Sequence, residues 1–168
     1  MNGAISRLKK IKMLALDVDG VLTDCRVFLD ESREWRRMFS IRDGYGLVRL
    51  REQGYKLAII TASKAKDIRE RAQVLKIDYF HDGNLDKLTE FNLLLKNSGL
   101  KAEEVAYMGD DLFDIPVLKE VGFAATVPEA MEEVFPVVQY ITKRPGGNGA
   151  VREVCELIIK YGTLGTQL

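Results

Sequence analysis

The strongest constraint on the fold is a regular alternation of short apolar runs with longer amphipathic segments. The clearest apolar runs are residues 13–16, 56–60, 105–108 and 122–127, with weaker ones at 77–80 and 137–141. Continuous apolar runs are typical of strands buried on both faces, and helices connect such strands when they run parallel. We therefore predict an α/β fold with a three-layer, doubly wound, mainly parallel sheet of the Rossmann-like kind.

Four segments between the apolar runs have helical character. They are residues 43–53, 64–75, 87–97 and 150–161. In the third, Leu88, Phe91 and Leu95 recur on one face, as in a helix packed on a core. Gly54 and Gly99 follow two of these segments and are expected to terminate them, because glycine readily adopts the left-handed conformation at a helix end.

Residues 21–41 interrupt this alternation. Two apolar and aromatic arms, residues 26–29 and 35–39, flank the polar residues 30–33. The pattern predicts a small β-hairpin inserted after the first strand. Since a two-stranded ribbon is only marginally stable alone, the hairpin should pack either on its own domain or on another subunit.

Length and charge limit the classes of function. The 168 residues suit one domain spanning residues 1–168. Lys plus Arg (25) equals Asp plus Glu (25), so no net charge draws the chain to nucleic acid or to an anionic membrane. No apolar run approaches the roughly 20 residues that span a bilayer. We expect a cytoplasmic protein in which Cys25 and Cys155 are free thiols of the kind found in protein cores.

Polar side chains recur where the apolar runs end. Ligands of parallel α/β sheets bind beyond the carboxyl ends of the strands, so these side chains are expected to form one site. Lys87, at the start of a predicted helix, belongs to the same set. The residues at the strand ends are Asp17, Asp19, Thr61, Asp110, Asp111 and Asp114.

This set of groups suits phosphoryl transfer assisted by a metal ion. Carboxylate oxygens favour a hard cation such as Mg²⁺, and Lys87 can neutralise further phosphate charge. Asp17 can attack phosphorus as a nucleophile, and Asp19 can act as general acid and then as general base. Thr61 can donate a hydrogen bond to a phosphoryl oxygen.

Each residue alone has a simpler interpretation. An aspartate at a strand end is often a turn former or a helix cap, and Asp114 could simply cap the next helix. Thr61 alone suits an N-cap, and Lys87 alone suits a solvated surface position. The catalytic hypothesis therefore depends on all of these residues occurring together, in this order, at strand ends.

The residues also resemble a known superfamily. Asp17-Val18-Asp19-Gly20-Val21-Leu22-Thr23 is similar to the first motif of the haloacid-dehalogenase superfamily of phosphohydrolases. Thr61, Lys87 and the segment 109–114 resemble its second, third and fourth motifs, in the same order. The resemblance covers nearly the whole chain. It implies a Mg²⁺-dependent phosphomonoester hydrolase that forms an aspartyl-phosphate on Asp17, with Asp19 as acid/base.

A closer resemblance is to the group of 3-deoxy-D-manno-octulosonate 8-phosphate phosphatases, which lack a large cap domain. It is carried by residues 17–24, 42–46, 84–87, 105–114 and 146–153. The resemblance implies a role in lipopolysaccharide sugar biosynthesis, a phosphorylated sugar-acid substrate and a homotetramer whose hairpins associate. It also implies that Mg²⁺ is held by the Asp17 carboxylate, the Asp19 carbonyl and Asp110, with Asp111 and Asp114 supporting them. The implied substrate contacts are Thr61, Ala62, Ser63, Lys64, Arg42 and Lys87.

One departure from the group bears on the substrate. The group typically has Gly and then Arg after the threonine, whereas this chain has Ala62 and Ser63, followed by Lys64. A lysine replaces a bidentate guanidinium poorly as a carboxylate ligand. A phosphatase for a related eight- or nine-carbon keto sugar acid phosphate, sialic-acid-like, is therefore an alternative. A receiver-type signalling domain and a non-catalytic oligomerisation module are alternatives of other classes.

Overall fold

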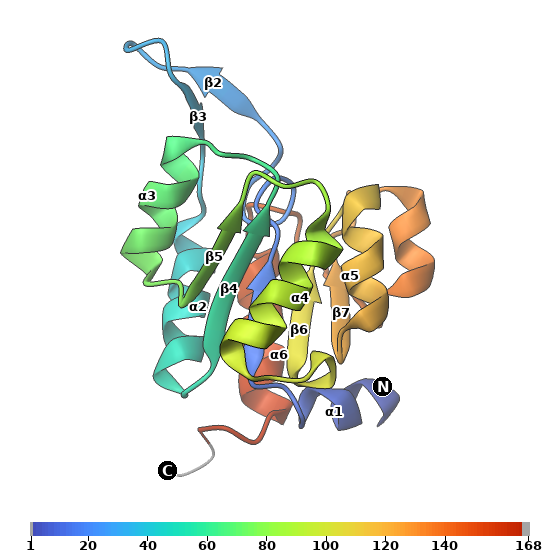
Figure 1. Ribbon diagram of the computed structural model, residues 1–168. Coiled ribbons are helices and arrows are strands. Elements are labelled where there is room, and N and C mark those ends of the chain that lie inside the picture. Colours follow the sequence, from blue (N-terminus) through green and yellow to red (C-terminus); the bar gives the residue numbers. More distant parts are fainter. Residues whose placement is uncertain (1, 166–168) are drawn as a thin grey trace.

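Six parallel strands form the central sheet of the protein (Figure 1), and the structure, a computed structural model, describes residues 2–165. The spatial order of the strands is β5-β4-β1-β6-β7-β8, and every neighbouring pair is parallel. The predicted doubly wound parallel sheet is confirmed. The strands are β1 (Met13–Leu16), β4 (Lys56–Thr61), β5 (Tyr79–Asp82), β6 (Val105–Met108), β7 (Phe123–Thr126) and β8 (Tyr140–Ile141).

Two weaker strand predictions were placed incorrectly. The third strand begins at Tyr79, because the preceding helix ends at Lys76 in a left-handed conformation and Ile77 still donates its N–H to the Ala72 carbonyl. The sixth strand is only Tyr140–Ile141. Of the apolar residues predicted before it, Val137 ends a 3₁₀ helix, η3 (Glu132–Val137), which buries Val134, and Val138 follows that helix as its C-cap.

Helices cover both faces of the sheet (Figure 1). In that view α4 (Lys87–Ser98) and α5 (Ile115–Glu120) lie in front of the strands. Behind them α2 (Ile41–Glu52) packs along α6 (Ala150–Tyr161), and α3 (Lys66–Leu75) lies beside α2.

Three of the four predicted helices have different bounds in the structure: α3 begins two residues later than expected, α4 ends one residue later, and α2 is shifted toward the N-terminus. Helix α2 begins two residues earlier than expected, because Ser40 caps it by accepting a hydrogen bond from the Asp43 N–H (3.3 Å). Helix α1 (Asn2–Leu8), which packs on α6 and β7, was not predicted. Its sequence contains only a few apolar residues among basic and polar ones, too few to show a clear helical pattern.

The two strands at the centre of the sheet are apolar throughout. All four residues of β1 and all four of β6 are buried, which accounts for their continuous apolar sequences. From β1 the chain proceeds outward to β4 and β5, then crosses to the other side of β1 to form β6, β7 and β8. The order therefore reverses between β1 and β6, and the crevice beyond their carboxyl ends is where such sheets bind ligands.

The predicted insertion after β1 is a hairpin that projects away from the sheet (Figure 1). It pairs β2 (Val27–Leu29) with β3 (Trp35–Arg37) in antiparallel register. Asp30 closes its turn by bonding Glu34 through both backbone and side chain. Its apolar side chains, including Phe28 and Trp35, are largely exposed. Two short 3₁₀ turns, η1 (Ala102–Glu104) and η2 (Leu112–Asp114), flank β6.

No helix among residues 2–165 is both long enough and apolar enough to cross a membrane. The two cysteines of the chain are unpaired; Cys155 is buried as predicted, whereas Cys25 is exposed, so the prediction of a core position is wrong for Cys25.

Candidate active site

The strand ends bring the predicted residues to one edge of the sheet. Asp17 directly follows β1, and its N–H donates to the Met108 carbonyl at the end of β6 (2.9 Å), which joins the two central strands at the site. Thr61 is the last residue of β4, and its Oγ1 accepts a hydrogen bond from the Ser63 N–H (3.2 Å). Asp17 and Thr61 are both buried, so neither is an ordinary surface turn residue.

Lys87 is a buried member of the site and not a solvated residue. Its side chain has no exposed surface, and its Nζ lies 2.8 Å from Asp17 Oδ1 and 2.7 Å from Asp114 Oδ1. Asp86 caps the helix by accepting from the Thr89 N–H (3.2 Å), which places Lys87 in the first turn of α4. The ammonium also lies 4.4 Å from the centre of the Phe113 ring, a favourable cation–π contact.

Asp114 organises the loop after β6. Its Oδ1 accepts hydrogen bonds from Lys87 and from the Tyr107 hydroxyl (2.6 Å). Its Oδ2 accepts from the backbone N–H groups of Asp110 (3.0 Å) and Asp111 (3.1 Å). Asp114 makes no capping hydrogen bond to α5 with its side chain, so the simple capping interpretation is wrong. With four donors bound to its two oxygens, this buried carboxylate fixes the loop that carries Asp110.

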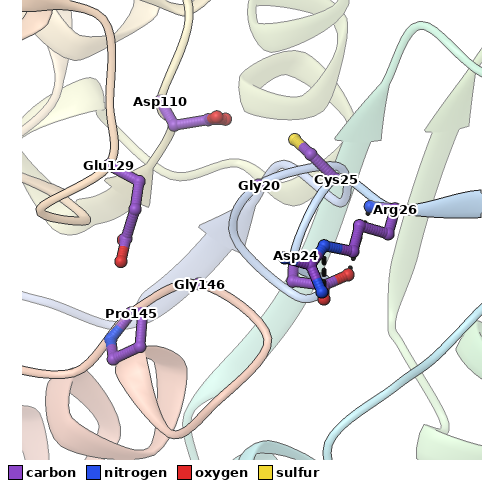
Figure 2. Close-up of a pocket in the computed structure, with 8 residues that line it drawn as sticks. All are labelled: Gly20, Asp24, Cys25, Arg26, Asp110, Glu129, Pro145 and Gly146. Carbon is purple, nitrogen blue, oxygen red and sulfur yellow. Dashed lines mark hydrogen bonds and ion pairs between the residues drawn. The ribbon is translucent and has the colours of Figure 1, made fainter.

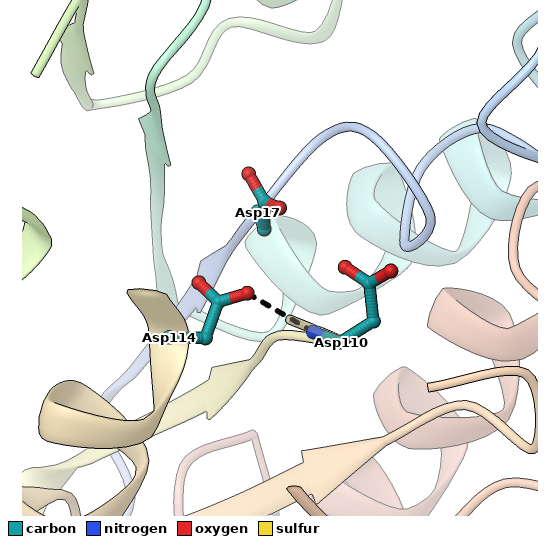
Figure 3. A group of neighbouring side chains, drawn as sticks. All are labelled: Asp17, Asp110 and Asp114. Atoms are coloured by element: carbon teal, nitrogen blue, oxygen red, sulfur yellow. Dashed lines mark hydrogen bonds between the residues drawn. The ribbon is translucent and has the colours of Figure 1, made fainter. Parts of the chain in front are cut away.

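Three carboxylates meet at the crevice (Figure 3). Oxygen atoms of Asp17, Asp110 and Asp114 all lie within 4.8 Å of one another. These three negative charges face the single positive charge of Lys87, which leaves two negative charges without compensation among these groups. Buried charges need a partner or a metal ion. The surplus matches the charge of one divalent cation.

The pKa shifts of these groups also indicate a cation site. Burial, followed by the negative charge of Asp114, raises the pKa of Asp17, and Lys87 only partly opposes this. Burial and Asp114 likewise raise the pKa of Asp110 from 3.8 to about 7. Burial disfavours the charged form of Lys87, but the charges of Asp17 and Asp114 outweigh it and raise the lysine pKa. A bound cation would favour the ionised form of both carboxylates.

The geometry of Asp110 also fits a cation. Its Oδ1 is buried, and among the described residues it has no hydrogen-bond partner. Gly20, at φ +90°, leaves the space for this carboxylate, since a Cβ at that position would lie 2.0 Å from Asp110 Oδ2. Mg²⁺ is a hard cation that binds oxygen ligands. The unpartnered Oδ1 of Asp110, together with the neighbouring carboxylate oxygens of the cluster, can supply such ligands. The donor set therefore agrees with the predicted cofactor.

Asp19 has a partner that the sequence analysis missed. Arg37, at the end of β3, donates from Nε to Asp19 Oδ1 (2.6 Å) and from Nη2 to Asp19 Oδ2 (3.0 Å). The guanidinium also contacts Asp67, in the first turn of α3, and the Ser63 hydroxyl. No local sequence signal links residue 37 to residue 19, because the contact depends on the direction in which the hairpin folds back.

Two cavities of about 270 Å³ open beside the carboxylates. The first contains the predicted nucleophile and acid/base, and its lining residues are Asp17, Asp19, Thr61, Ala62, Ser63 and Phe113. The second is on the Asp110 side of the crevice and is shown in Figure 2. It is lined by Gly20, Asp24, Cys25, Arg26, Asp110, Glu129, Pro145 and Gly146.

Three predicted substrate contacts, Lys87, Lys64 and Arg42, lie outside both linings, and of these Lys87 contacts Asp17 directly. The Lys64 side chain runs over Gly83, where an added Cβ would lie 2.0 Å from its Cε. Arg42 lines a separate surface cavity beside Met38 and Asn148. The structure therefore does not bring Lys64 or Arg42 to the carboxylates in this single chain. Their role in substrate binding stays a prediction.

A glycine-rich loop packs directly on the first motif. A Cβ on Gly146 would lie 1.8 Å from the Gly20 carbonyl oxygen, so only glycine allows this approach. Asp43, a buried residue of α2, holds the end of the loop by accepting from the N–H groups of Gly149 (3.0 Å) and Arg152 (2.8 Å). Asp43 was expected as part of a helix and of the segment 42–46 that carries the family resemblance, but no contact of its side chain was predicted.

Comparison with known proteins identifies the family. Residues 80–154 match a family model for haloacid dehalogenase-like hydrolases. The chain is 40% identical to the 3-deoxy-D-manno-octulosonate 8-phosphate phosphatase KdsC of Escherichia coli K12 over 155 residues, 92% of this chain and 82% of that protein. It is 41% identical to KdsC of Yersinia pestis, over 92% of this chain and 83% of that protein.

Solved structures agree with the sequence comparison. A 3-deoxy-D-manno-octulosonate 8-phosphate phosphatase from Moraxella catarrhalis, in complex with magnesium, phosphate and KDO, superimposes with a TM-score of 0.93 at 41% identity, covering 96% of this chain and 93% of that one. The cobalt-bound Haemophilus influenzae phosphatase has a TM-score of 0.88 at 34% identity, covering 92% of this chain and 91% of that one.

The chain therefore belongs to the haloacid-dehalogenase-like hydrolases, in the family of the 3-deoxy-D-manno-octulosonate 8-phosphate phosphatases. It is an enzyme, a phosphatase, as the sequence predicted. The receiver-domain and non-catalytic hypotheses are wrong.

Proposed function

We propose that the protein hydrolyses 3-deoxy-D-manno-octulosonate 8-phosphate to the free sugar acid and phosphate, as a step in lipopolysaccharide sugar biosynthesis. The observation that carries the chemistry is the cluster of the buried Asp17 and Asp114 and the partly buried Asp110 beside Lys87, at the reversal of strand order. The substrate is supported by relatives of that name that match nearly the whole chain.

In the first step Asp17 attacks the substrate phosphorus. A carboxylate oxygen of Asp17 forms a bond to phosphorus while the bond from phosphorus to the sugar oxygen breaks. Asp19, as a carboxylic acid, gives its proton to the departing sugar oxygen. The products are the free sugar acid and an aspartyl-phosphate on Asp17.

In the second step water releases the phosphate. The Asp19 carboxylate takes a proton from the water, whose oxygen then bonds to phosphorus as the bond to Asp17 breaks. This regenerates the Asp17 carboxylate and the Asp19 acid, so that the cycle is balanced. The lining of one cavity by both Asp17 and Asp19 supports this division of roles.

Lys87 and Thr61 position the reacting groups. Lys87 holds one oxygen of Asp17 at 2.8 Å, which fixes the carboxylate and places a positive charge beside the incoming phosphate. The Thr61 hydroxyl is oriented by the hydrogen bond from the Ser63 N–H and can donate to a phosphoryl oxygen.

The residues that would hold Mg²⁺ are the carboxylates of Asp17 and Asp110 and the backbone carbonyl of Asp19. Asp114 and Asp111 would support them, and the four hydrogen bonds already accepted by Asp114 favour this supporting role over direct ligation. When bound, Mg²⁺ neutralises negative charge on the phosphate and on the carboxylates.

Recognition of the sugar acid depends on residues beside the nucleophile that differ from the family pattern. The cavity beside the nucleophile has Ala62 and Ser63 where the family typically has Gly and Arg, and the Ser63 hydroxyl already accepts from Arg37 (3.3 Å). Arg42 and Lys64 remain candidates for the substrate carboxylate. A related eight- or nine-carbon keto sugar acid phosphate is the alternative substrate that this difference favours.

A phosphate-release screen tests the proposal. The substrates are 3-deoxy-D-manno-octulosonate 8-phosphate, a nine-carbon sialic-acid-like 9-phosphate and simple hexose 6-phosphates, each with Mg²⁺ or with EDTA. We expect Mg²⁺-dependent activity and a kcat/KM at least about tenfold higher for the eight-carbon substrate, about 1.4 kcal/mol of discrimination. Preference for the nine-carbon substrate would show that the protein is a phosphatase for the related keto sugar acid phosphate instead. Preference for hexose phosphates would contradict both.

We further propose that the protein acts as a cytoplasmic homotetramer in which the hairpins associate. The exposed apolar side chains of β2 and β3 support an interface there, and the two free thiols suit a reducing compartment. Light scattering on the purified chain tests the assembly. A monomer at micromolar concentration would contradict it.

A further inference from the structure

Arg37 links the hairpin to the acid/base Asp19. The guanidinium binds both oxygens of the Asp19 carboxylate, through Nε at 2.6 Å and Nη2 at 3.0 Å. Its side chain is only 9% exposed, whereas that of Asp19 is 37% exposed. This paired geometry is the strongest form of arginine–carboxylate contact, and it fixes the orientation of the carboxylate as well as its position.

Arg37 is itself held from the opposite side. Asp67, in the first turn of α3, accepts from the Arg37 backbone N–H (2.8 Å) and from its Nη1 (3.2 Å). Nη2 also donates to the Ser63 hydroxyl (3.3 Å). The hairpin, the loop after β4 and the start of α3 therefore converge on one buried guanidinium.

Asp19 has little else to hold it. Among residues 2–165, its other side-chain hydrogen bond is a long one of 3.5 Å, from the Thr23 hydroxyl. A general acid must stay within hydrogen-bond reach of the leaving oxygen, and small displacements of a catalytic group are costly to rate. An aspartate that is partly exposed and without a firm partner would sample several rotamers.

We propose that Arg37 is a positioning residue that aims the Asp19 carboxyl group at the leaving oxygen, with Asp67 as its anchor. This inference rests on the acid/base role proposed above for Asp19. It gives the hairpin a function within its own chain, in addition to the proposed interface.

The neighbouring Arg36 provides a matched control. It lies on the same strand of the hairpin, but its ion pairs are to Asp30 (2.8 Å), Glu34 and, on α3, Glu70 (3.6 Å). Substitution of Arg36 therefore removes a guanidinium and hairpin ion pairs without touching Asp19.

The positioning role of Arg37 is tested by varying the leaving group of the phosphate ester. A p-nitrophenolate departs readily without a proton, whereas a simple alkoxide needs one, so general-acid catalysis matters far more for alkyl phosphates. We measure kcat/KM for p-nitrophenyl phosphate, phenyl phosphate and glycerol 3-phosphate, none of which carries a carboxylate. For Arg37→Ala we expect a loss of about 10- to 100-fold on the alkyl ester, part of the 10²–10⁴ contributed by a positioned acid, and under about threefold on the nitrophenyl ester.

Three other variants should give graded losses of activity on the alkyl ester, down to none for the control. Arg37→Lys should recover part of the loss, because an ammonium keeps the charge but binds one oxygen instead of two. Asp67→Asn should give a smaller loss in the same direction. Arg36→Ala should leave all three substrates unchanged. The ratio of two kcat/KM values on one preparation does not depend on the fraction of folded enzyme, so partial misfolding does not obscure the result.

Asp19→Asn separates the two levels of the hypothesis. If Asp19→Asn lowers all substrates equally, the acid/base role itself fails. If Asp19→Asn is selective for the alkyl ester but Arg37→Ala lowers all substrates equally or none, the positioning role is overturned. In the double variant, Arg37→Ala should add no further selectivity to Asp19→Asn, and a full additional loss on the alkyl ester would also overturn it.

Discussion

The titration of Asp110 makes the metal-free protein dependent on pH in a defined direction. Burial and the Asp114 charge raise the pKa of this carboxyl from 3.8 to about 7. Between these two values the folded protein retains a proton that the unfolded chain has lost. The free energy of unfolding therefore falls as pH rises through this window, and it levels off above about pH 7.

The size of the effect follows from the shift. From pH 5 up to the folded-state pKa of about 7, the free energy of unfolding falls by about 1.36 kcal/mol for each pH unit. The fall between pH 5 and pH 8 is therefore about 3 kcal/mol. For a chain of 168 residues this corresponds to a fall of roughly 6–12 °C in Tm. Saturating Mg²⁺ should remove the trend, because a cation bound to Asp110 replaces the proton.

Asp110→Asn isolates this contribution. The amide has nearly the same shape but does not titrate, so the difference between wild type and Asp110→Asn cancels the titration of other groups. We would measure urea unfolding in EDTA from pH 5 to pH 8. Wild type should lose about 3 kcal/mol relative to Asp110→Asn, and Mg²⁺ should stabilise wild type only. Parallel pH curves for the two proteins in EDTA would refute the reasoning.

Three further substitutions test other parts of the site. Asp17→Asn should lower kcat by more than about 1,000-fold with unfolding little changed, and activity near wild type would show that another group is the nucleophile. Lys87→Met should destabilise the metal-free protein by about 3–5 kcal/mol, because it leaves buried carboxylates uncompensated; a change below about 1 kcal/mol in urea unfolding would contradict this. Gly20→Ala should raise the Mg²⁺ concentration for half-maximal activity at least about tenfold, since its Cβ would occupy the space of Asp110; an unchanged Mg²⁺ titration would oppose the assigned cation site.

The sheet was predictable where strands are fully buried. Residues 13–16 and 105–108 form β1 and β6 with the predicted bounds, because a strand covered on both faces must be apolar at every position. The edge strands β5 and β8 are partly exposed, and β8 is only two residues long, so their sequences carry little pattern. Helix α1 escaped prediction for the same reason.

The set of groups in the site was predictable because topology brings strand ends together. Thr61 ends a recognisable strand, Asp17 and Asp110 follow two others, and parallel strands place such residues at one edge whatever the details of packing. The protonation of these groups was not predictable. It depends on burial and on the distances among Asp17, Lys87 and Asp114, which only the packed structure defines.

By itself, the sequence determined the buried central strands, the family and the set of polar groups that gather at the strand ends, because each is encoded by local pattern or by position relative to a strand end. Only the tertiary structure decided how those groups are held. The contact of Arg37 with Asp19 joins a hairpin to a loop, and that of Asp43 with Gly149 joins two segments far apart in the chain. Hydrogen bonds of this kind depend on the direction in which side chains point after folding. No periodicity or spacing in the sequence therefore predicts them.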